Sequence, residues 1–344
     1  MTNKIIFVTP FKDSSHIELE ANIIKNYIDI YKNYKFILLS GEKHWNKVKK
    51  ELKKQKKNLT IIPLGNSKIP FFIKTTIYLW FFRKEKKIHL AYDPYTLPLQ
   101  TCVPFLFAFD VIFMHGYWRE INKSIHKYLH LFLLKRLILR KNTKIISLGK
   151  WIALNINKDR LLKKSEKRKF FWIYHPAKKS KWKRKKKKKI NFGLLWRPWN
   201  HYKNVILSNI KKIRTEIKKA GGTFLSWWKH FISKQKYIDI LNNSDYILNF
   251  STKYDYRCSG IIIEAICSGK PIVGISNTMI EFLKKEVGDI WYVYKNVEKV
   301  DIKKICQDFI RKEKYKNQKR NIKKLEQKYT DQELIKYQIK KIGI

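Results

Sequence analysis

The sequence predicts an α/β fold made of two doubly wound domains followed by a helical tail. The chain has 344 residues, which is more than one hydrophobic core usually organises. Its composition is 44% hydrophobic and 15% aromatic, so a large core can form despite the charge. Strand-like and helix-like segments alternate in both halves, and this order is typical of parallel sheets covered by helices.

The first half alternates from its start. Short apolar runs predict buried strands, and apolar residues at helical spacing predict amphipathic helices. Strands are expected at 4–10, 34–40, 59–65, 88–93, 110–116, 144–148 and 170–176, and helices at 17–31, 43–56, 69–87 and about 121–141. The first domain therefore covers 1–177.

A basic segment at 178–189 separates the halves, because a run so rich in lysine does not pack into a core. The alternation then restarts and predicts a second α/β domain over 190–300. Its strands are expected at 190–196, 222–228, 245–251, 271–276 and 289–294, and its helices at 203–219, 233–243, 260–268 and 278–286. The tail, 301–344, is helical by charge and periodicity and could pack back on the first domain.

The formal net charge is +49, from 76 Lys and Arg against 27 Asp and Glu. Such a charge attracts polyanions and anionic lipid. Only 12 of the 76 basic residues are arginine, and abundant Lys, Ile and Asn are also expected from A/T-rich codons. The charge alone therefore does not identify a partner. Arg119, Arg197 and Arg257 are more informative, because a planar bidentate fork cannot be replaced by lysine.

Other features bear on the compartment. The four cysteines form no CxxC pair and no zinc spacing, so neither a disulfide frame nor a structural metal is indicated. The N-terminus lacks a secretory signal pattern, and the apolar stretch from Leu97 is interrupted by Pro98, Pro104 and Asp110. We expect a cytoplasmic protein that can sit peripherally on the inner face of the cell membrane. The aromatic and basic segment 71–87 is either a core helix or an interfacial helix on an anionic membrane surface.

A candidate binding site follows the strand predicted at 245–251. Ser259 and Gly260 can open a helix whose free N–H groups suit a phosphate. Glu264 comes about one turn later, where a carboxylate can accept hydrogen bonds from a ribose diol. Each residue also has a structural interpretation, because Glu264 could pair with a lysine on the surface and Arg257 could form an ordinary ion pair.

A family resemblance links these segments. The stretch "GIIIEAICSGKPIVG" (260–274) resembles the nucleotide-binding core of retaining glycosyltransferases of the GT-B architecture, especially their fourth sequence family. The stretch "INFGLLWRPWNHYKN" (190–204) resembles the strand and loop that carry an Arg and a Lys for the donor diphosphate, here Arg197 and Lys203. The stretch "DVIFMHG" (110–116) resembles the strand that ends in a histidine near the transferred sugar, here His115, which otherwise would be a structural histidine.

The resemblance implies two Rossmann-like domains facing each other across a cleft. It also implies transfer of a sugar from a nucleotide-sugar donor to a saccharide or lipid-linked acceptor with retention of configuration, as in bacterial surface polysaccharide synthesis. His115, Arg197 and Lys203 are then the catalytic residues. The donor-binding residues are Glu264, Ser259, Gly260, Arg257, Tyr256 and Ile261.

The chain also departs from the family pattern. Tyr256 stands where the family has a second glutamate, and "PFKDSSH" (10–16) replaces its Gly-rich loop. The chain contains no DxD sequence, so no divalent metal and no other cofactor is expected, and Arg197, Lys203 and the helix start would stabilise the leaving diphosphate.

Two other functions are consistent with parts of the sequence. The positive charge and the segment "KWKRKKKKK" would suit a nucleic-acid-binding protein, but the basic residues are spread along the chain and no nucleic-acid-binding motif is evident. Tyr256 would suit a noncatalytic relative with the same fold. The donor base, sugar, acceptor and linkage do not follow from the sequence.

Overall fold

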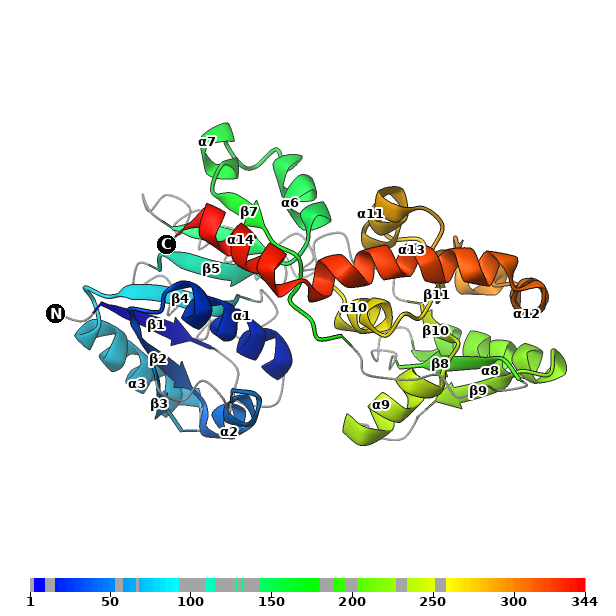
Figure 1. Ribbon diagram of the computed structural model, residues 1–344, viewed down its shortest axis with the longest axis horizontal. Helices are drawn as coiled ribbons and strands as arrows, with labels where there is room; N and C mark the ends of the chain where they lie inside the picture. Colours follow the sequence, from blue (N-terminus) through cyan, green and yellow to red (C-terminus); the bar gives the residue numbers. More distant parts are fainter. Residues whose placement is uncertain are drawn as a thin grey trace. The chain divides into compact units, whose positions relative to one another are not determined.

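The computed structural model describes residues 3–9, 16–52, 58–65, 68–92, 109–114, 128, 132, 143–179, 189–195, 203–226, 234–250 and 258–343 (Figure 1). The chain divides into two compact units. Unit 1 comprises Met1–Pro176, Asp255–Cys258 and Asp331–Ile344, and unit 2 comprises Ala177–Tyr254 and Ser259–Thr330. Each unit is built on a parallel sheet flanked by helices, which confirms the predicted fold class.

The sheet of unit 1 has seven strands in the order β3-β2-β1-β4-β5-β6-β7. They are β1 (Lys4–Val8), β2 (Lys35–Ser40), β3 (Leu59–Pro63), β4 (Lys86–Tyr92), β5 (Val111–Met114), β6 (Lys144–Ser147) and β7 (Phe170–Trp172). All paired strands are parallel. Continuous apolar runs such as "IIFV" in β1 are buried on both faces, as expected for a parallel sheet covered by helices.

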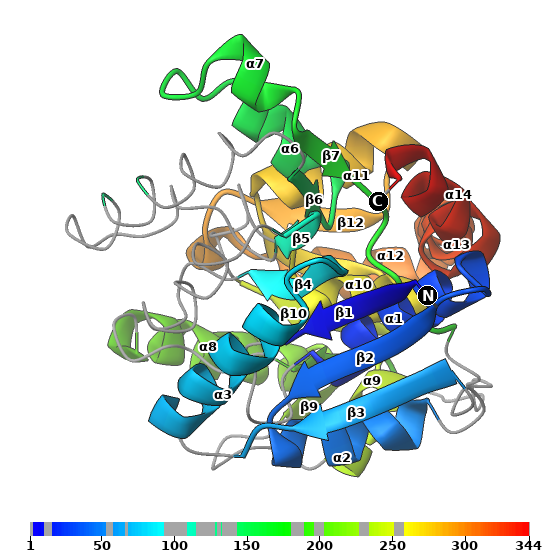
Figure 2. The same ribbon diagram turned by 90° about the vertical axis from the view of Figure 1, so that its left-hand side faces the viewer.

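Helices cover both faces of this sheet. In the described part of unit 1 these helices include α1 (Ile17–Ile30), α2 (Glu42–Glu51), α3 (Lys68–Phe81), α6 (Lys150–Asn157) and α7 (Lys164–Lys167). Figures 1 and 2 show α1 and α3 on opposite faces. The four-residue α7 has no counterpart among the expected elements, because one helical turn leaves no periodic signal. The helix expected at about 121–141 lies outside the described residues, apart from 128 and 132.

The sheet of unit 2 has five parallel strands in the order β12-β11-β10-β8-β9. They are β8 (Asn191–Leu194), β9 (Thr223–Ser226), β10 (Tyr246–Asn249), β11 (Ile272–Ile275) and β12 (Trp291–Tyr294). The helices are α8 (Lys203–Lys219), α9 (Lys234–Asn243), α10 (Gly260–Cys267), α11 (Thr278–Val287), the short η4 (Val297–Lys299), α12 (Ile302–Arg311) and α13 (Glu313–Thr330). In the core the Tyr246 and Phe192 rings stack with centroids 5.7 Å apart.

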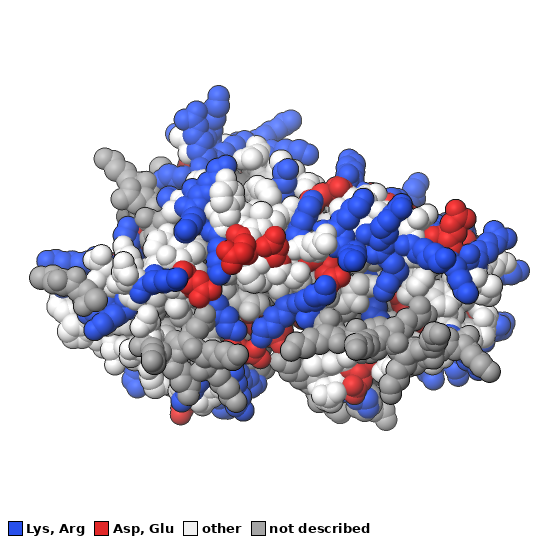
Figure 3. Space-filling model, viewed as in Figure 1, with Lys and Arg blue, Asp and Glu red and all other residues white. Residues whose placement is uncertain are grey.

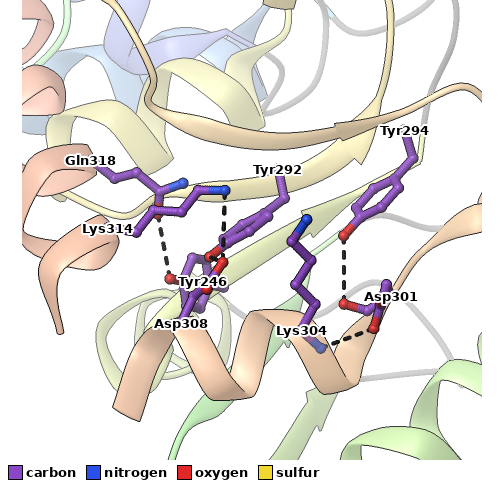
Figure 4. A network of polar contacts seen from close by, with 8 residues as sticks. All are labelled: Tyr246, Tyr292, Tyr294, Asp301, Lys304, Asp308, Lys314 and Gln318. Atoms are coloured by element: carbon purple, nitrogen blue, oxygen red, sulfur yellow. Dashed lines mark hydrogen bonds and ion pairs between the residues drawn. The ribbon is translucent and has the colours of Figure 1, made fainter. Parts of the chain in front are cut away.

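A polar network joins α12 and α13 to the sheet of unit 2 (Figure 4). The Tyr292 hydroxyl donates to Asp308 Oδ2 at 2.7 Å, and Lys314 Nζ lies 3.7 Å from the same oxygen. The hydroxyl of the buried Tyr246 donates to Gln318 Oε1 at 3.4 Å. Burial is the main cause that raises the pKa of both tyrosines, so they remain neutral donors. Neutral tyrosine hydroxyls on the sheet therefore hydrogen-bond to α12 and α13.

The last helix, α14 (Gln332–Ile342), belongs to unit 1. Asp331 caps it, because its carboxylate accepts the Leu334 N–H at 3.0 Å. Ile335, Ile339 and Ile342 are buried in the same core cluster as residues of α1 and β1. The chain therefore passes from unit 2 to unit 1 between the end of α13 and this cap.

Basic side chains are distributed over the visible surface of both units (Figure 3). Lys and Arg appear on many elements of this face, with Asp and Glu in smaller groups between them. This distribution agrees with the even spread of lysine along the sequence. Within the described ranges, no helix has the length and apolarity needed to cross a bilayer.

Candidate functional site

The strand order of unit 2 contains one topological switch point. From β8 the chain moves to β9 on one side and then returns to β10 on the other side, so β8 and β10 are central neighbours. Their pairing places Leu194 beside Leu248, so both strands end at the same edge of the sheet. Ligands of doubly wound sheets bind where such loops diverge. In the sequence, the predicted donor residues Arg197 and Lys203 come after β8, and Ser259 to Glu264 come after β10.

Helix α10 begins at this edge. Ser259 is 4% exposed and is the N-cap, and its hydroxyl oxygen accepts the Ile262 N–H at 3.4 Å. Gly260 is exposed, and among the described atoms none lies within 4 Å of the position that a Cβ would take. Ile261 is half-buried. Gly260 therefore presents an exposed residue at the helix N-terminus, a position that favours an anionic ligand.

Glu264 lies one turn further along α10, and its carboxylate is exposed. It accepts a short hydrogen bond from the Tyr237 hydroxyl of α9. Tyr237 is half-buried, and its hydroxyl gives the exposed carboxylate a hydrogen-bond partner on the neighbouring helix. Tyr237 could not be identified from the sequence, because periodicity locates a tyrosine on a helix and does not say which neighbouring helix its hydroxyl reaches.

One cysteine lies in the same helix. Burial is the main cause that raises the pKa of the Cys267 thiol to about 12, with smaller contributions from the Glu326 and Glu264 carboxylates. A thiol with this pKa is protonated at neutral pH and is a poor nucleophile. The useful chemistry of α10 is therefore binding by backbone N–H groups, a hydroxyl and a carboxylate.

Unit 1 has an equivalent switch point between β1 and β4, which pair side by side. Thr9 follows β1 directly. Its hydroxyl donates to Glu20 Oε1 at 2.8 Å, and the other oxygen of Glu20 lies 2.8 Å from His44 Nε2. All three side chains are fully buried. This chain of contacts links the carboxyl end of β1 to α1 and α2.

Two histidines lie near the same edge of unit 1. His16 precedes α1 with a left-handed φ of 57°, which is uncommon for a residue other than glycine. His175 follows β7. Burial, followed by the charge of His16, lowers the pKa of His175 to about 4, so its imidazole is neutral at pH 7. A neutral imidazole can donate and accept hydrogen bonds, but it carries no charge for an anion.

The structure describes only part of the predicted site. It brings Ser259, Gly260, Ile261 and Glu264 together on α10. Lys203 is the first residue of α8, the helix that follows β8, and its side chain is not described. The remaining predicted site residues, which are His115, Arg197, Tyr256 and Arg257, lie outside the described residues. Within the described ranges no group of three or more His, Cys, Asp or Glu could hold a metal ion.

Two helix-covered parallel sheets in succession, each with a central switch point, and a helical tail place this chain in the GT-B fold class. The structure is similar to HepE of Anabaena in complex with UDP-glucose, with a TM-score of 0.65, 13% identity and 98% of each chain covered. It is equally similar to a glycosyltransferase of Rickettsia africae, with a TM-score of 0.65, 13% identity, and 99% of this chain and 97% of that chain covered.

The same fold also occurs in a protein with a different description. A protein of Listeria monocytogenes, described as a UDP-N-acetylglucosamine 2-epimerase, has a TM-score of 0.56 and 10% identity, with 96% of this chain and 93% of that chain covered. No protein family matches the sequence, and neither does any curated protein. Because similarity at these identities establishes the fold, the function has to be argued from the site.

Proposed function

We propose that the protein is a glycosyltransferase that moves a sugar from a nucleotide-sugar donor to a saccharide or lipid-linked acceptor. The observation that carries this proposal is the coincidence of two independent features. In the sequence, Arg197 and Lys203 come after β8 and the donor-like segment 260–274 comes after β10, and these are the two strands that form the switch point of unit 2. The complex of the similar protein HepE with UDP-glucose is consistent with the proposal.

In this proposal, the N–H groups at Ser259 and Gly260 bind the donor diphosphate and the Glu264 carboxylate accepts from the ribose hydroxyls. Arg197 and Lys203 stabilise the negative charge that develops on the nucleoside diphosphate as the sugar leaves. His115 contacts the transferred sugar, and Arg257, Tyr256 and Ile261 complete the donor contacts. Since the sequence has no DxD, these fixed cations take the role that a divalent ion would have.

The finer assignments follow from the family resemblance. They are membership of the fourth sequence family, retention of configuration, a hexosyl group as the transferred sugar and a role in bacterial surface polysaccharide synthesis. Retention requires that the acceptor oxygen ends on the face of the anomeric carbon from which the diphosphate departs. NMR of the anomeric proton in the first-formed product measures this directly, and an inverted product would contradict the assignment.

The main experiment is a thermal-shift screen against UDP-, GDP- and ADP-sugars, followed by a transfer assay with the nucleotide sugar that stabilises the protein. A ligand at about 100 times its Kd stabilises the folded state by about 2.7 kcal/mol. Stabilisation by a nucleotide sugar without transfer or hydrolysis would favour a noncatalytic relative. Conversion of the sugar while it stays attached to the nucleotide would favour an epimerase.

Arg197→Ala tests the electrostatic role. Loss of one such donor costs about 3 kcal/mol in the activation barrier, so turnover should fall about 100-fold with an unchanged unfolding temperature. Arg214→Ala is the matched control, because Arg214 is an exposed arginine on α8, away from the start of that helix. Turnover near the wild-type rate for Arg197→Ala would contradict the assigned role.

A further inference from the structure

Helix α3 of unit 1 has one buried face and one exposed apolar face. Phe71, Thr75 and Leu79 recur at four-residue spacing and are buried toward the sheet. The opposite face is also apolar, although it is open to solvent. Its exposed fractions are 50% for Ile73, 48% for Ile77, 56% for Trp80 and 67% for Phe81. At 100° per residue these four side chains fall within an arc of about 100°, so they form one surface.

This exposed surface, which we call the α3 face, is bordered by cations. Lys74, Arg83 and Lys84 are exposed beside it, and the sequence from Lys68 to Lys84 contains no acidic residue. The Arg83 guanidinium lies 4.9 Å from the centroid of the Trp80 ring, and the Trp80 and Phe81 rings meet edge to face at 5.5 Å. The exposed apolar residues therefore have cations at their border.

We propose that the α3 face binds an anionic lipid surface. Branched aliphatic and aromatic side chains on one face of a helix insert at the boundary of headgroups and acyl chains, while adjacent Lys and Arg meet anionic headgroups. The arginine and tryptophan pair suits this boundary, because each has an apolar body and a polar end. The apolar part from Ile73 to Phe81 is only about 12 Å long, so binding is reversible and depends on the anionic lipid.

The charges favour lipid over a second copy of the chain. A two-fold symmetric contact through the α3 face would bring Lys74, Arg83 and Lys84 toward the same cations of the partner, with no acidic residue on the helix to compensate. An anionic bilayer instead complements these cations. This inference does not depend on the proposed glycosyl transfer.

Vesicle flotation of the full-length protein tests the proposal. We expect the wild type to float with phosphatidylcholine vesicles that contain phosphatidylglycerol, and to remain unbound with phosphatidylcholine alone. The double variant Trp80→Ser/Phe81→Ser should reduce the partition coefficient by about tenfold or more. Leu154→Ser/Leu161→Ser is the matched control, because these leucines are 42% and 45% exposed elsewhere in unit 1, and it should change partition by less than about twofold.

A charge series separates this surface from a diffuse effect of the net charge. Lys74→Gln/Arg83→Gln/Lys84→Gln should abolish flotation, and Lys158→Gln/Arg160→Gln/Lys164→Gln, which removes the same charges from another exposed part of unit 1, should largely preserve it. An equal loss in both triple variants would overturn the proposal in favour of nonspecific attraction. Absence of wild-type flotation would also overturn it, as would a concentration-dependent dimer that Trp80→Ser/Phe81→Ser dissociates while lipid binding is unchanged.

Discussion

Gly260 allows a structural role and a binding role to be separated at a single residue. Its φ is not positive, and no described atom would crowd a Cβ there, so Gly260→Ala should not destabilise the protein and should raise the free energy of unfolding by up to about 1 kcal/mol. A diphosphate that approaches the helix start closely would meet the added methyl group. We therefore expect nucleotide-sugar affinity to fall about tenfold, measured by calorimetry.

The comparison for this substitution is Gly274→Ala on β11. A Cβ there would lie 2.7 Å from the backbone oxygen of Asn249, so this variant should lose stability because backbone cannot move aside easily. If Gly260→Ala binds the donor as the wild type does, the helix start does not contact the diphosphate.

The hydrogen bond from Tyr237 to Glu264 can also be tested at a single residue. Tyr237→Phe removes the hydrogen bond to Glu264 and leaves the ring in place. One such bond contributes about 1 kcal/mol, so the KM for the donor should rise about fivefold while kcat changes little. Tyr337→Phe, on an exposed tyrosine of α14, should change neither constant. Equal donor KM values for wild type, Tyr237→Phe and Glu264→Gln would identify this pair as a surface contact without a binding role.

At the scale of elements, two helix caps in the C-terminal tail belong to different units. Asp331 caps α14 and Asp301 caps α12, with acceptor distances of 3.0 and 2.9 Å to the backbone N–H three residues later. Replacing either aspartate by alanine should cost about 1 kcal/mol. Because α14 packs in the core of unit 1 and α12 in unit 2, Asp331→Ala should destabilise unit 1 and Asp301→Ala should destabilise unit 2. Hydrogen exchange resolved by peptide measures the two effects, and a loss confined to unit 2 in both variants would contradict this assignment of α14.

The elements also show what the sequence could predict. The bounds of α8, α10 and α11 could be predicted to within about a residue, because strong periodicity meets a cap or glycine at their ends. Which polar residues are buried could not be predicted in this way. Glu20 lies in an amphipathic helix and His44 in a charged one, where both would be expected to face water. In the structure both are fully buried, and Glu20 contacts His44 and also accepts from Thr9, which lies 11 residues away in sequence.

In the candidate site too, local features could be predicted from the sequence and long-range contacts could not. The helix start at Ser259 could be predicted, because Ser and Gly directly ahead of the apolar run 261–267 are a local signal. The Tyr237 contact could not be predicted, because it joins residues 27 positions apart on two helices. The neighbouring positions of β8 and β10, which bring the two donor segments to the same edge, also depend on the folded sheet, because β9 separates these strands in sequence.

At the scale of the whole molecule, the two units should respond differently to acid. In unit 1, His89 is 2% exposed on β4, and among the described residues its Nδ1 has no hydrogen-bond partner. Burial lowers the pKa of His89 to about 3, and burial with the nearby His16 lowers that of His175 to about 4. The described part of unit 2 contains no histidine.

The lowered pKa values of His89 and His175 determine how the stability of unit 1 changes with pH. An unfolded histidine has a pKa of about 6.5, so below this pH the unfolded chain binds protons that folded unit 1 does not accept until the pH approaches 4 and then 3. Stability is therefore fully present above about pH 6.5 and is lost as the pH falls. From pH 7 to pH 5 the loss should be about 2 kcal/mol for His89, with a smaller contribution from the half-buried His175.

Hydrogen exchange at pH 7, 6 and 5, corrected for the intrinsic exchange rate, measures this difference without assuming a single unfolding transition for two units. Protection in the strands of unit 1 should fall with acid more steeply than protection in the strands of unit 2. Because the net charge of +49 also becomes more positive in acid, the comparison is made at high salt, where general repulsion is screened and the desolvation of a buried imidazole is not. His89→Leu should flatten the slope of unit 1. Equal slopes for the two units in the wild type would mean that global repulsion, and not buried histidine, controls the acid response.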